Sequence, residues 1–196
     1  HRNCEVKKIV VEDGKVTSVL LADGRHVYGK HFISNMHPVT TLEMTETSLI
    51  KSAYRSRVKN LENSIGGFVI NIVFKKDSFK YLKNNYYCNK EEHIWSLTEY
   101  TEENWPLAYA VFFSASSKSE EFAESMTILA YMKYDEVKEW AGTFNTVSAE
   151  AGRGEGYEAF KKRKAEKLLN LAEEKFPGLK ESIKTLPKHP GPGPHR

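Results

Sequence analysis

The stretch that organises this chain is CEVKKIVVEDGKVTSVLLADGRHVYGKHFISNMHP, residues 4–38. Glu5–Val11 is a β-prone run that ends before Asp13-Gly14, and a second apolar run reaches Leu21 before Asp23-Gly24. An Asp-Gly pair suits a tight connection because glycine adopts positive φ without steric cost. The spacing therefore predicts a β-hairpin followed by a return strand.

The end of this stretch predicts a binding edge. His31–Ser34 has the character of a short strand, and it stops at Asn35, Met36, His37 and Pro38. In open α/β sheets, ligands bind where the carboxyl ends of strands meet. We therefore expect the strand ending at Ser34 to point toward a ligand.

The middle of the chain predicts a sheet. Phe68–Phe74 is a near-continuous apolar run, which is typical of a central strand buried on both faces. His93–Leu97, Tyr109–Phe113 and Met126–Met132 are three further β-like runs. We interpret Lys118–Glu124 as an exposed turn or short helical excursion between the last two. Runs that follow one another in this way favour an antiparallel meander.

Helical patterns surround these runs. Pro38–Glu46 can open a helix at its proline, and Ser48–Leu61 and Glu155–Lys175 carry apolar residues at helical spacing. Pro177-Gly178 ends the last of these helices. The predicted fold class is therefore α+β, with a mostly antiparallel sheet covered by helices.

Two sets of residues carry a resemblance to a known family. The first comprises Val6, Ile9, Val11, Glu12 to Val16, Val19, Leu21, Asp23-Gly24, Ile33 to Asn35 and Pro38. The second comprises Tyr157, Lys161, Ala165, Leu168, Leu169 and Phe176 to Leu179. Together they resemble the phytoene desaturase-like FAD-dependent oxidoreductases, which include carotenoid isomerases and retinol saturases.

The resemblance implies a domain organisation and an activity. Residues 1–38 correspond to a hairpin and strand of the FAD-binding domain, and residues 39–185 to the substrate-binding domain. Residues 186–196 depart from the family pattern, and their richness in proline and glycine predicts a tail that is disordered or artificially appended. The implied reaction acts on carbon–carbon bonds of a hydrophobic polyene or isoprenoid-like substrate. Flavin supplies the hydride chemistry in such enzymes, so we name no catalytic side chain.

The resemblance also implies cofactor contacts. It places Glu5 and Val6 on the strand beside the adenine end of FAD, and Ser34, Asn35 and Pro38 at the turn near the flavin. The chain has no G-x-G-x-x-G run, the motif that brings backbone close to a pyrophosphate. We therefore expect an internal fragment that is inactive alone and whose partner is the remainder of its own chain.

Composition narrows the other functional classes. The net charge of +3 is a small excess of 29 basic over 26 acidic residues, so no nucleic-acid partner is expected. No apolar run approaches the roughly 20 residues of a membrane span. We expect a soluble, cytoplasmic protein and leave peripheral membrane contact open.

The histidines lack the spacing of metal ligands, so no metal site is expected. Gly152–Gly156 favours a hinge over a phosphate loop.

Aromatic residues crowd the predicted sheet region, and a face lined by them would suit a long apolar substrate. For most of these positions, taken singly, ordinary core packing is the favoured explanation, and together they permit a hydrophobic tunnel. Two alternatives therefore stay open: a stand-alone module that binds an apolar ligand, and a fragment of an amine oxidase-like or porphyrinogen oxidase-like flavoprotein.

Overall fold

The computed structural model describes residues 4–62, 64–90, 94–117, 119–143 and 152–186. The chain divides into two compact units, which we call the N-terminal unit, up to Ser64, and the sheet unit, from Ile65. The sequence placed a domain boundary after residue 38. Residues 39–64 instead cluster with the N-terminal unit. The assignment of the two parts to FAD and substrate domains stays a prediction.

The N-terminal unit is built on a three-stranded antiparallel sheet in the order β1-β2-β3. Its strands are β1 (Val6–Glu12), β2 (Lys15–Leu21) and β3 (His26–Tyr28). Asp13 and Gly14 connect β1 to β2 with φ of 49° and 76°, the positive values that Asp-Gly favours. The structure thus forms the predicted hairpin and return strand.

Two helices complete this unit. Helix α1 (Pro38–Met44) has Pro38 in its first turn, and the Nδ1 atom of His37 accepts a hydrogen bond from the Val39 amide at 3.3 Å. Helix α2 (Ser52–Lys59) is shorter than the predicted Ser48–Leu61 and buries only Val58 among its residues. The Arg55 guanidinium of α2 donates to the carbonyl oxygens that follow α1, including that of Thr45 at 2.6 Å. This bond holds the connection between the helices.

The predicted strand over His31–Ser34 was wrong. The chain leaves the sheet after β3, and residues 31–35 have no regular secondary structure. The side chain of Ile33 is 98% exposed. A strand needs a neighbour that pairs its backbone groups. No described strand pairs with these residues, so the backbone remains irregular.

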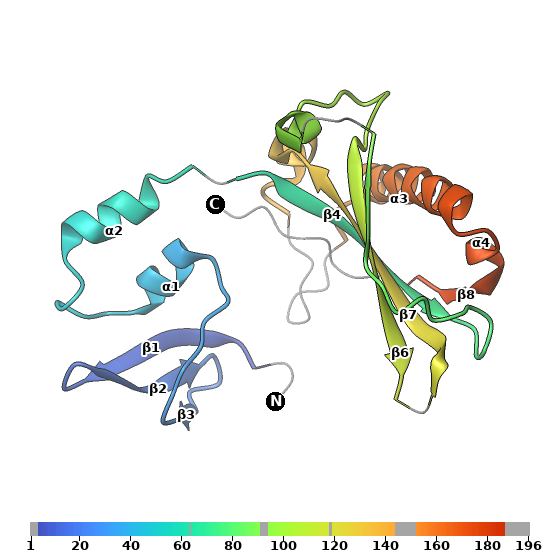
Figure 1. The fold of residues 1–196 in the computed structure, drawn as a ribbon. Helices are drawn as coiled ribbons and strands as arrows, with labels where there is room; N and C mark the ends of the chain where they lie inside the picture. Colours follow the sequence, from blue (N-terminus) through green and yellow to red (C-terminus); the bar gives the residue numbers. More distant parts are fainter. Residues whose placement is uncertain (1–3, 63, 91–93, 118, 144–151, 187–196) are drawn as a thin grey trace. The chain divides into compact units, whose positions relative to one another are not determined.

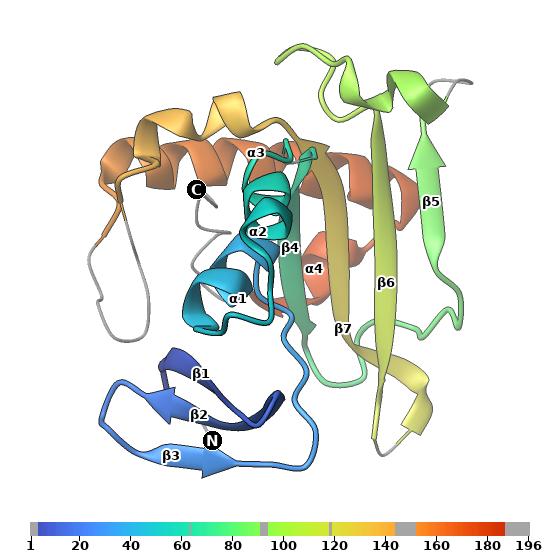
Figure 2. The ribbon, with the colours of Figure 1, turned by 90° about the vertical axis from the view of Figure 1, so that its left-hand side faces the viewer.

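The sheet unit contains a five-stranded antiparallel sheet in the order β5-β6-β7-β4-β8 (Figures 1 and 2). Its strands are β4 (Gly66–Phe74), β5 (Tyr86–Asn89), β6 (Ala108–Ser116), β7 (Ser119–Met132) and β8 (Ile183–Thr185). The unit also has helices α3 (Glu155–Lys175) and α4 (Leu179–Ser182) and 3₁₀ turns η1 (Ile94–Thr98), η2 (Tyr134–Glu136) and η3 (Lys138–Trp140). The predicted α+β class with a mostly antiparallel sheet is confirmed.

The sheet has two chemically different faces. Along β4, Ile70, Ile72 and Phe74 are buried whereas Val69 is 42% exposed. Helices α3 and α4 lie over the buried face (Figure 1), and Leu168 of α3 joins the same core. We call the opposite face the open face. The prediction that Phe68–Phe74 is buried on both sides was therefore wrong, because the described helices of this unit cover one side.

Several local predictions also need correction. The residues described from the β-like run His93–Leu97 belong to the 3₁₀ turn η1, and the predicted excursion at Lys118–Glu124 is largely part of β7. The first turn after Pro177-Gly178 continues into an unpredicted edge strand, β8. Residues 187–196 of the predicted tail lie outside the described residues. No helix in the described ranges combines the length and apolar character needed to cross a bilayer.

Candidate functional site

A pocket of about 380 Å³ lies on the open face, toward the end where β7 finishes. Its floor is made by the small side chains of Ala108 and Ala110 on β6. Ala110 stands in register between Tyr87 of β5 and Leu129 of β7. Because larger side chains flank each alanine, the sheet surface is hollowed where a ligand can lie.

Aromatic rings form the walls of this pocket. Tyr87 contacts Phe112 edge to face, with ring centroids 6.1 Å apart, and Tyr131 lies on the adjacent strand. Tyr87 is 70% exposed and Tyr131 is 41% exposed. Contiguous exposed apolar surface of this kind commonly marks a binding site. The chemistry offered by the pocket is apolar contact with few polar groups.

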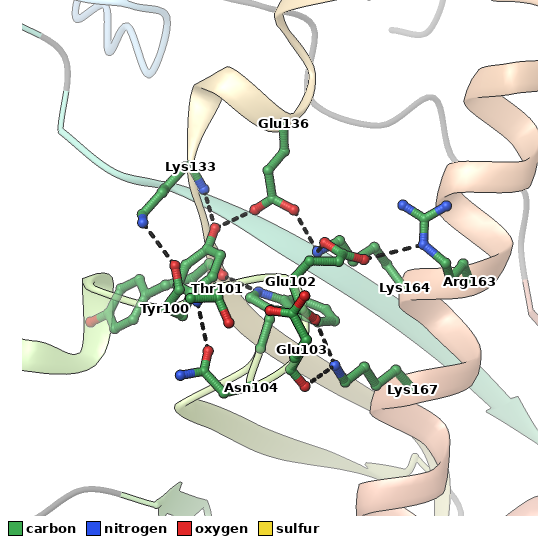
Figure 3. A network of polar contacts seen from close by, with 12 residues as sticks. Tyr100, Thr101, Glu102, Glu103, Asn104, Lys133, Glu136, Arg163, Lys164 and Lys167 are labelled. Atoms are coloured by element: carbon green, nitrogen blue, oxygen red, sulfur yellow. Dashed lines mark hydrogen bonds and ion pairs between the residues drawn. The ribbon is translucent and has the colours of Figure 1, made fainter.

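A polar network fixes the segment that follows η1 (Figure 3). Leu97 of η1 lines the pocket, and Tyr100 lies three residues later. The Tyr100 hydroxyl donates to Glu136 and accepts from the backbone amide of Lys133. The Lys133 ammonium donates to the carbonyl of Tyr100 at 2.9 Å. These bonds fix the chain that follows η1 against the end of β7.

Lys164 of α3 is the centre of the same network. Its side chain is 1% exposed, and its Nζ atom forms ion pairs with Glu136 and, at 2.7 Å, with Glu102. The ammonium also lies 4.2 Å from the ring centroid of Trp105. A buried ammonium is tolerated only when it is paired. The two carboxylates satisfy this requirement and join the loop around residue 102, η2 and α3.

The protonation of the network follows from its contacts. Partial burial would raise the pKa of Glu102, but the hydrogen bonds and charges of Lys164 and Arg163 outweigh it, and the pKa is lowered. Burial raises the pKa of the Tyr100 phenol, and its hydrogen bond to Glu136 raises it further. Tyr100 is therefore neutral and Glu102 charged near neutral pH. With Lys164 enclosed and paired, we assign the network a structural role.

The network and the pocket share a direct link. The indole Nε1 of buried Trp105 donates to the backbone carbonyl of Tyr131 at 2.7 Å, and the Tyr131 side chain lines the pocket. Trp105 in turn packs under Lys164. A change at Lys164 is therefore expected to reach the pocket wall through two contacts.

A smaller hollow of about 250 Å³ lies at the β5 edge beside α3. It is lined in part by Cys88, Lys90 and Glu174. Burial raises the pKa of the neighbouring Tyr109 phenol, and its hydrogen bond with Cys88 contributes. The Tyr109 hydroxyl donates to the carbonyl of Leu171 at 3.3 Å. In the described ranges, no group of three or more His, Cys, Asp and Glu side chains is arranged to hold a metal ion.

Of the predicted FAD contacts, the first two lie where β1 begins. The Glu5 carboxylate pairs with Lys7 at 2.7 Å, and its backbone carbonyl accepts from the Ala22 amide at 2.8 Å. Val6 pairs with Leu21 across the hairpin. These residues have ordinary roles in the sheet, and their contact with an adenine stays a prediction.

The other three predicted contacts lie before and at the start of α1. The hydroxyls of Ser34 and Thr41 are 2.8 Å apart, Asn35 lies in the irregular segment that leads into the helix, and Pro38 is in the first turn. The structure gives Ser34 and Pro38 roles in starting α1. It does not bring these residues into a described contact with Glu5 or Val6. Their role near a flavin stays a prediction.

Sequence reasoning missed the Lys164 network and the pocket floor. Lys164 falls within a lysine- and glutamate-rich helix, but it lies four residues after Phe160 and four before Leu168, on the apolar stripe. A lysine on such an apolar stripe indicates that its ammonium needs a buried counter-charge.

A scan of family models gives no match for this chain, and comparisons with curated proteins and with solved structures give none either.

Proposed function

We propose that this chain is part of an FAD-dependent oxidoreductase, and that the open face of its sheet is the wall along which a hydrophobic polyene or isoprenoid-like substrate lies. The observation that carries the proposal is the alanine-floored, aromatic-walled pocket on the open face. Apolar pockets with few polar groups suit such substrates. The sheet with helices on one side leaves the other side available for ligand.

The N-terminal unit supports the flavoprotein part of the proposal. Its hairpin carries residues that resemble the phytoene desaturase-like family. The exposed Ile33 follows β3, which pairs with β2 on one side and with no described strand on the other. We propose that the remainder of the parent protein supplies both a strand that pairs with the outer edge of β3 and the pyrophosphate-binding motif. The described chain would then bind substrate but require that remainder for turnover.

Two measurements test this proposal. The first is cofactor content: the gene product containing this chain should purify yellow and release FAD on denaturation. A colourless protein that takes up no added FAD would refute the oxidoreductase assignment. The second is binding of the apolar polyene 1,6-diphenylhexatriene by the chain itself, followed by the rise in its fluorescence.

A pocket-filling variant makes the second measurement specific. Ala110→Trp places an indole on the pocket floor and should weaken diphenylhexatriene binding at least tenfold. Val69→Trp is the matched control, because Val69 is exposed on the open face but does not line the pocket. Equal effects of the two substitutions would remove the pocket from the proposal.

A stand-alone binding module is the second candidate function. It is favoured by one observation, namely that the sheet unit alone supplies all the described residues that line the pocket. This candidate predicts ligand binding by a gene product that never takes up FAD. The two measurements above therefore separate it from the flavoenzyme.

A further inference from the structure

Asn89 gives the pocket a polar end. The described lining residues offer apolar side chains, three tyrosine rings and one side-chain amide, that of Asn89 at the last position of β5. Asn89 is exposed and pairs in register with Ala108, so it stands beside the floor. An amide both donates and accepts hydrogen bonds. A ligand end group at the floor would meet this amide.

The hydroxyls of Tyr109 and Tyr87 are less suited to that role. The Tyr109 hydroxyl donates to the Leu171 carbonyl on the helix side of the sheet. Tyr87 is 70% exposed, and the hydroxyl of a tyrosine is the side-chain atom farthest from the backbone. The short side chain of Asn89 keeps its amide near the backbone. Asn89 therefore lies closer to the level of the floor.

The charges around the pocket restrict the end group further. None of the described residues that line it is an Asp, Glu, Lys, Arg or His. Asn89 also borders the smaller hollow beside α3, which Lys90 and Glu174 help to line, but neither of these charged residues lines the open-face pocket. A carboxylate that gives up part of its hydration here finds no counter-charge among the described lining residues, so it pays a desolvation cost that a neutral end group avoids. The pocket therefore favours an uncharged end group.

From these observations we propose that the pocket selects a neutral amphipathic ligand, whose apolar chain lies over Ala108 and Ala110 and whose hydroxyl or carbonyl end hydrogen-bonds to the Asn89 amide. Asn89 is thus a specificity-determining residue. This inference rests on the proposed function in one respect, because the pocket must hold an apolar chain.

Competition against bound diphenylhexatriene tests the inference. The competitors are dodecan-1-ol, dodecane and dodecanoate, at a pH where dodecanoate is ionised. Dodecan-1-ol should displace the probe at lower concentration than dodecanoate. In Asn89→Leu, the ratio of the dodecan-1-ol to the dodecane displacement constant should rise about 3- to 10-fold, the effect of losing one hydrogen bond. Comparing this ratio between the unaltered chain and the variant cancels the different water solubilities of the two competitors.

Matched variants complete the test. Tyr87→Phe and Tyr131→Phe should leave the ratio unchanged, and retained probe affinity in Asn89→Leu shows that the pocket is intact. An unchanged ratio in Asn89→Leu, or tighter binding of dodecanoate than of dodecan-1-ol, would overturn the inference while the pocket itself stands. If the unaltered chain binds no diphenylhexatriene, the proposed pocket fails first, and the two failures are distinguishable.

Discussion

The two units of this chain bury apolar residues to very different extents. The sheet unit has a continuous core that runs from Ile70 on β4 to Leu179 on α4. Among the described residues of the N-terminal unit, the buried apolar side chains are Ile9, Leu21 and Val58, whereas the exposed large ones are Val27, Tyr28, Ile33, Leu49, Tyr54 and Leu61. Small domains with little buried area are only marginally stable. The sheet unit therefore carries the stability, and the N-terminal unit presents surface.

Tryptophan emission distinguishes unfolding of the sheet unit from unfolding of the N-terminal unit. All three tryptophans of the chain, Trp95, Trp105 and Trp140, lie in the sheet unit. Tryptophan emission during denaturation therefore reports unfolding of the sheet unit, and backbone hydrogen exchange reports both.

The largest effect is expected in the core of the sheet unit. Leu168 is fully buried in α3, so Leu168→Ala removes packed methyl groups and leaves a cavity. We expect a loss of about 3 to 4 kcal/mol in the free energy of unfolding, measured by tryptophan emission in urea. A loss below about 1 kcal/mol would show that the core is loosely packed, and the contrast between the units would no longer hold.

The second-largest loss in the free energy of unfolding is expected from a change in the Lys164 network. Lys164→Met leaves the Glu136 carboxylate partly buried without its counter-charge, and we expect a loss of about 3 kcal/mol by the same measurement. Lys161→Met is the control, because Lys161 pairs with an exposed residue, Glu158, and such pairs contribute under about 1 kcal/mol. Equal losses in the two variants would contradict the structural role of the Lys164 ion pairs.

A smaller and local effect is expected in the N-terminal unit. Ile9→Ala removes one of its few buried side chains and should cost about 2 kcal/mol within that unit. Hydrogen exchange of β1 and β2 should accelerate, while the tryptophan-detected midpoint stays unchanged. A shift of that midpoint would show that the units unfold together.

The smallest effect concerns pH. The pKa of Glu102 in the folded protein is lowered from 4.5, so its contribution to stability is complete above that value and is lost as the pH falls through the folded pKa. Glu102→Gln should flatten this part of the tryptophan-detected stability profile as the pH falls below 4.5. Glu46 also has a lowered pKa, through Lys8 in the N-terminal unit. Glu46→Gln should leave the tryptophan profile unchanged.

Local sequence patterns predicted the parts of the fold that depend on local physics. The Asp13-Gly14 turn needs positive φ and occurs where the pair stands. Helix α3 has the predicted bounds, because its apolar stripe and the Pro177-Gly178 stop are both local signals. By contrast, His31–Ser34 had strand character but no described partner, and the described part of His93–Leu97 became a 3₁₀ turn. Strand formation depends on a neighbour that local patterns do not reveal.

The candidate site shows the same division. The sequence revealed the aromatic richness of the sheet region but gave no means of dividing those residues between core and surface. That division depends on strand register: Tyr86 turns toward the helices and contacts Phe176, whereas Tyr87 turns to the open face. A shift of one residue would exchange them.

The α+β class, the N-terminal hairpin and the long C-terminal helix follow from the order of the residues alone, because turns and periodicity are set by neighbours in the chain. Folding in three dimensions was needed to place Ala110 between Tyr87 and Leu129 as a pocket floor, and to bring Lys164 to Glu102 and Glu136. These groups come from distant parts of the chain. Their meeting depends on pairing and packing energies that are summed over the whole sheet unit.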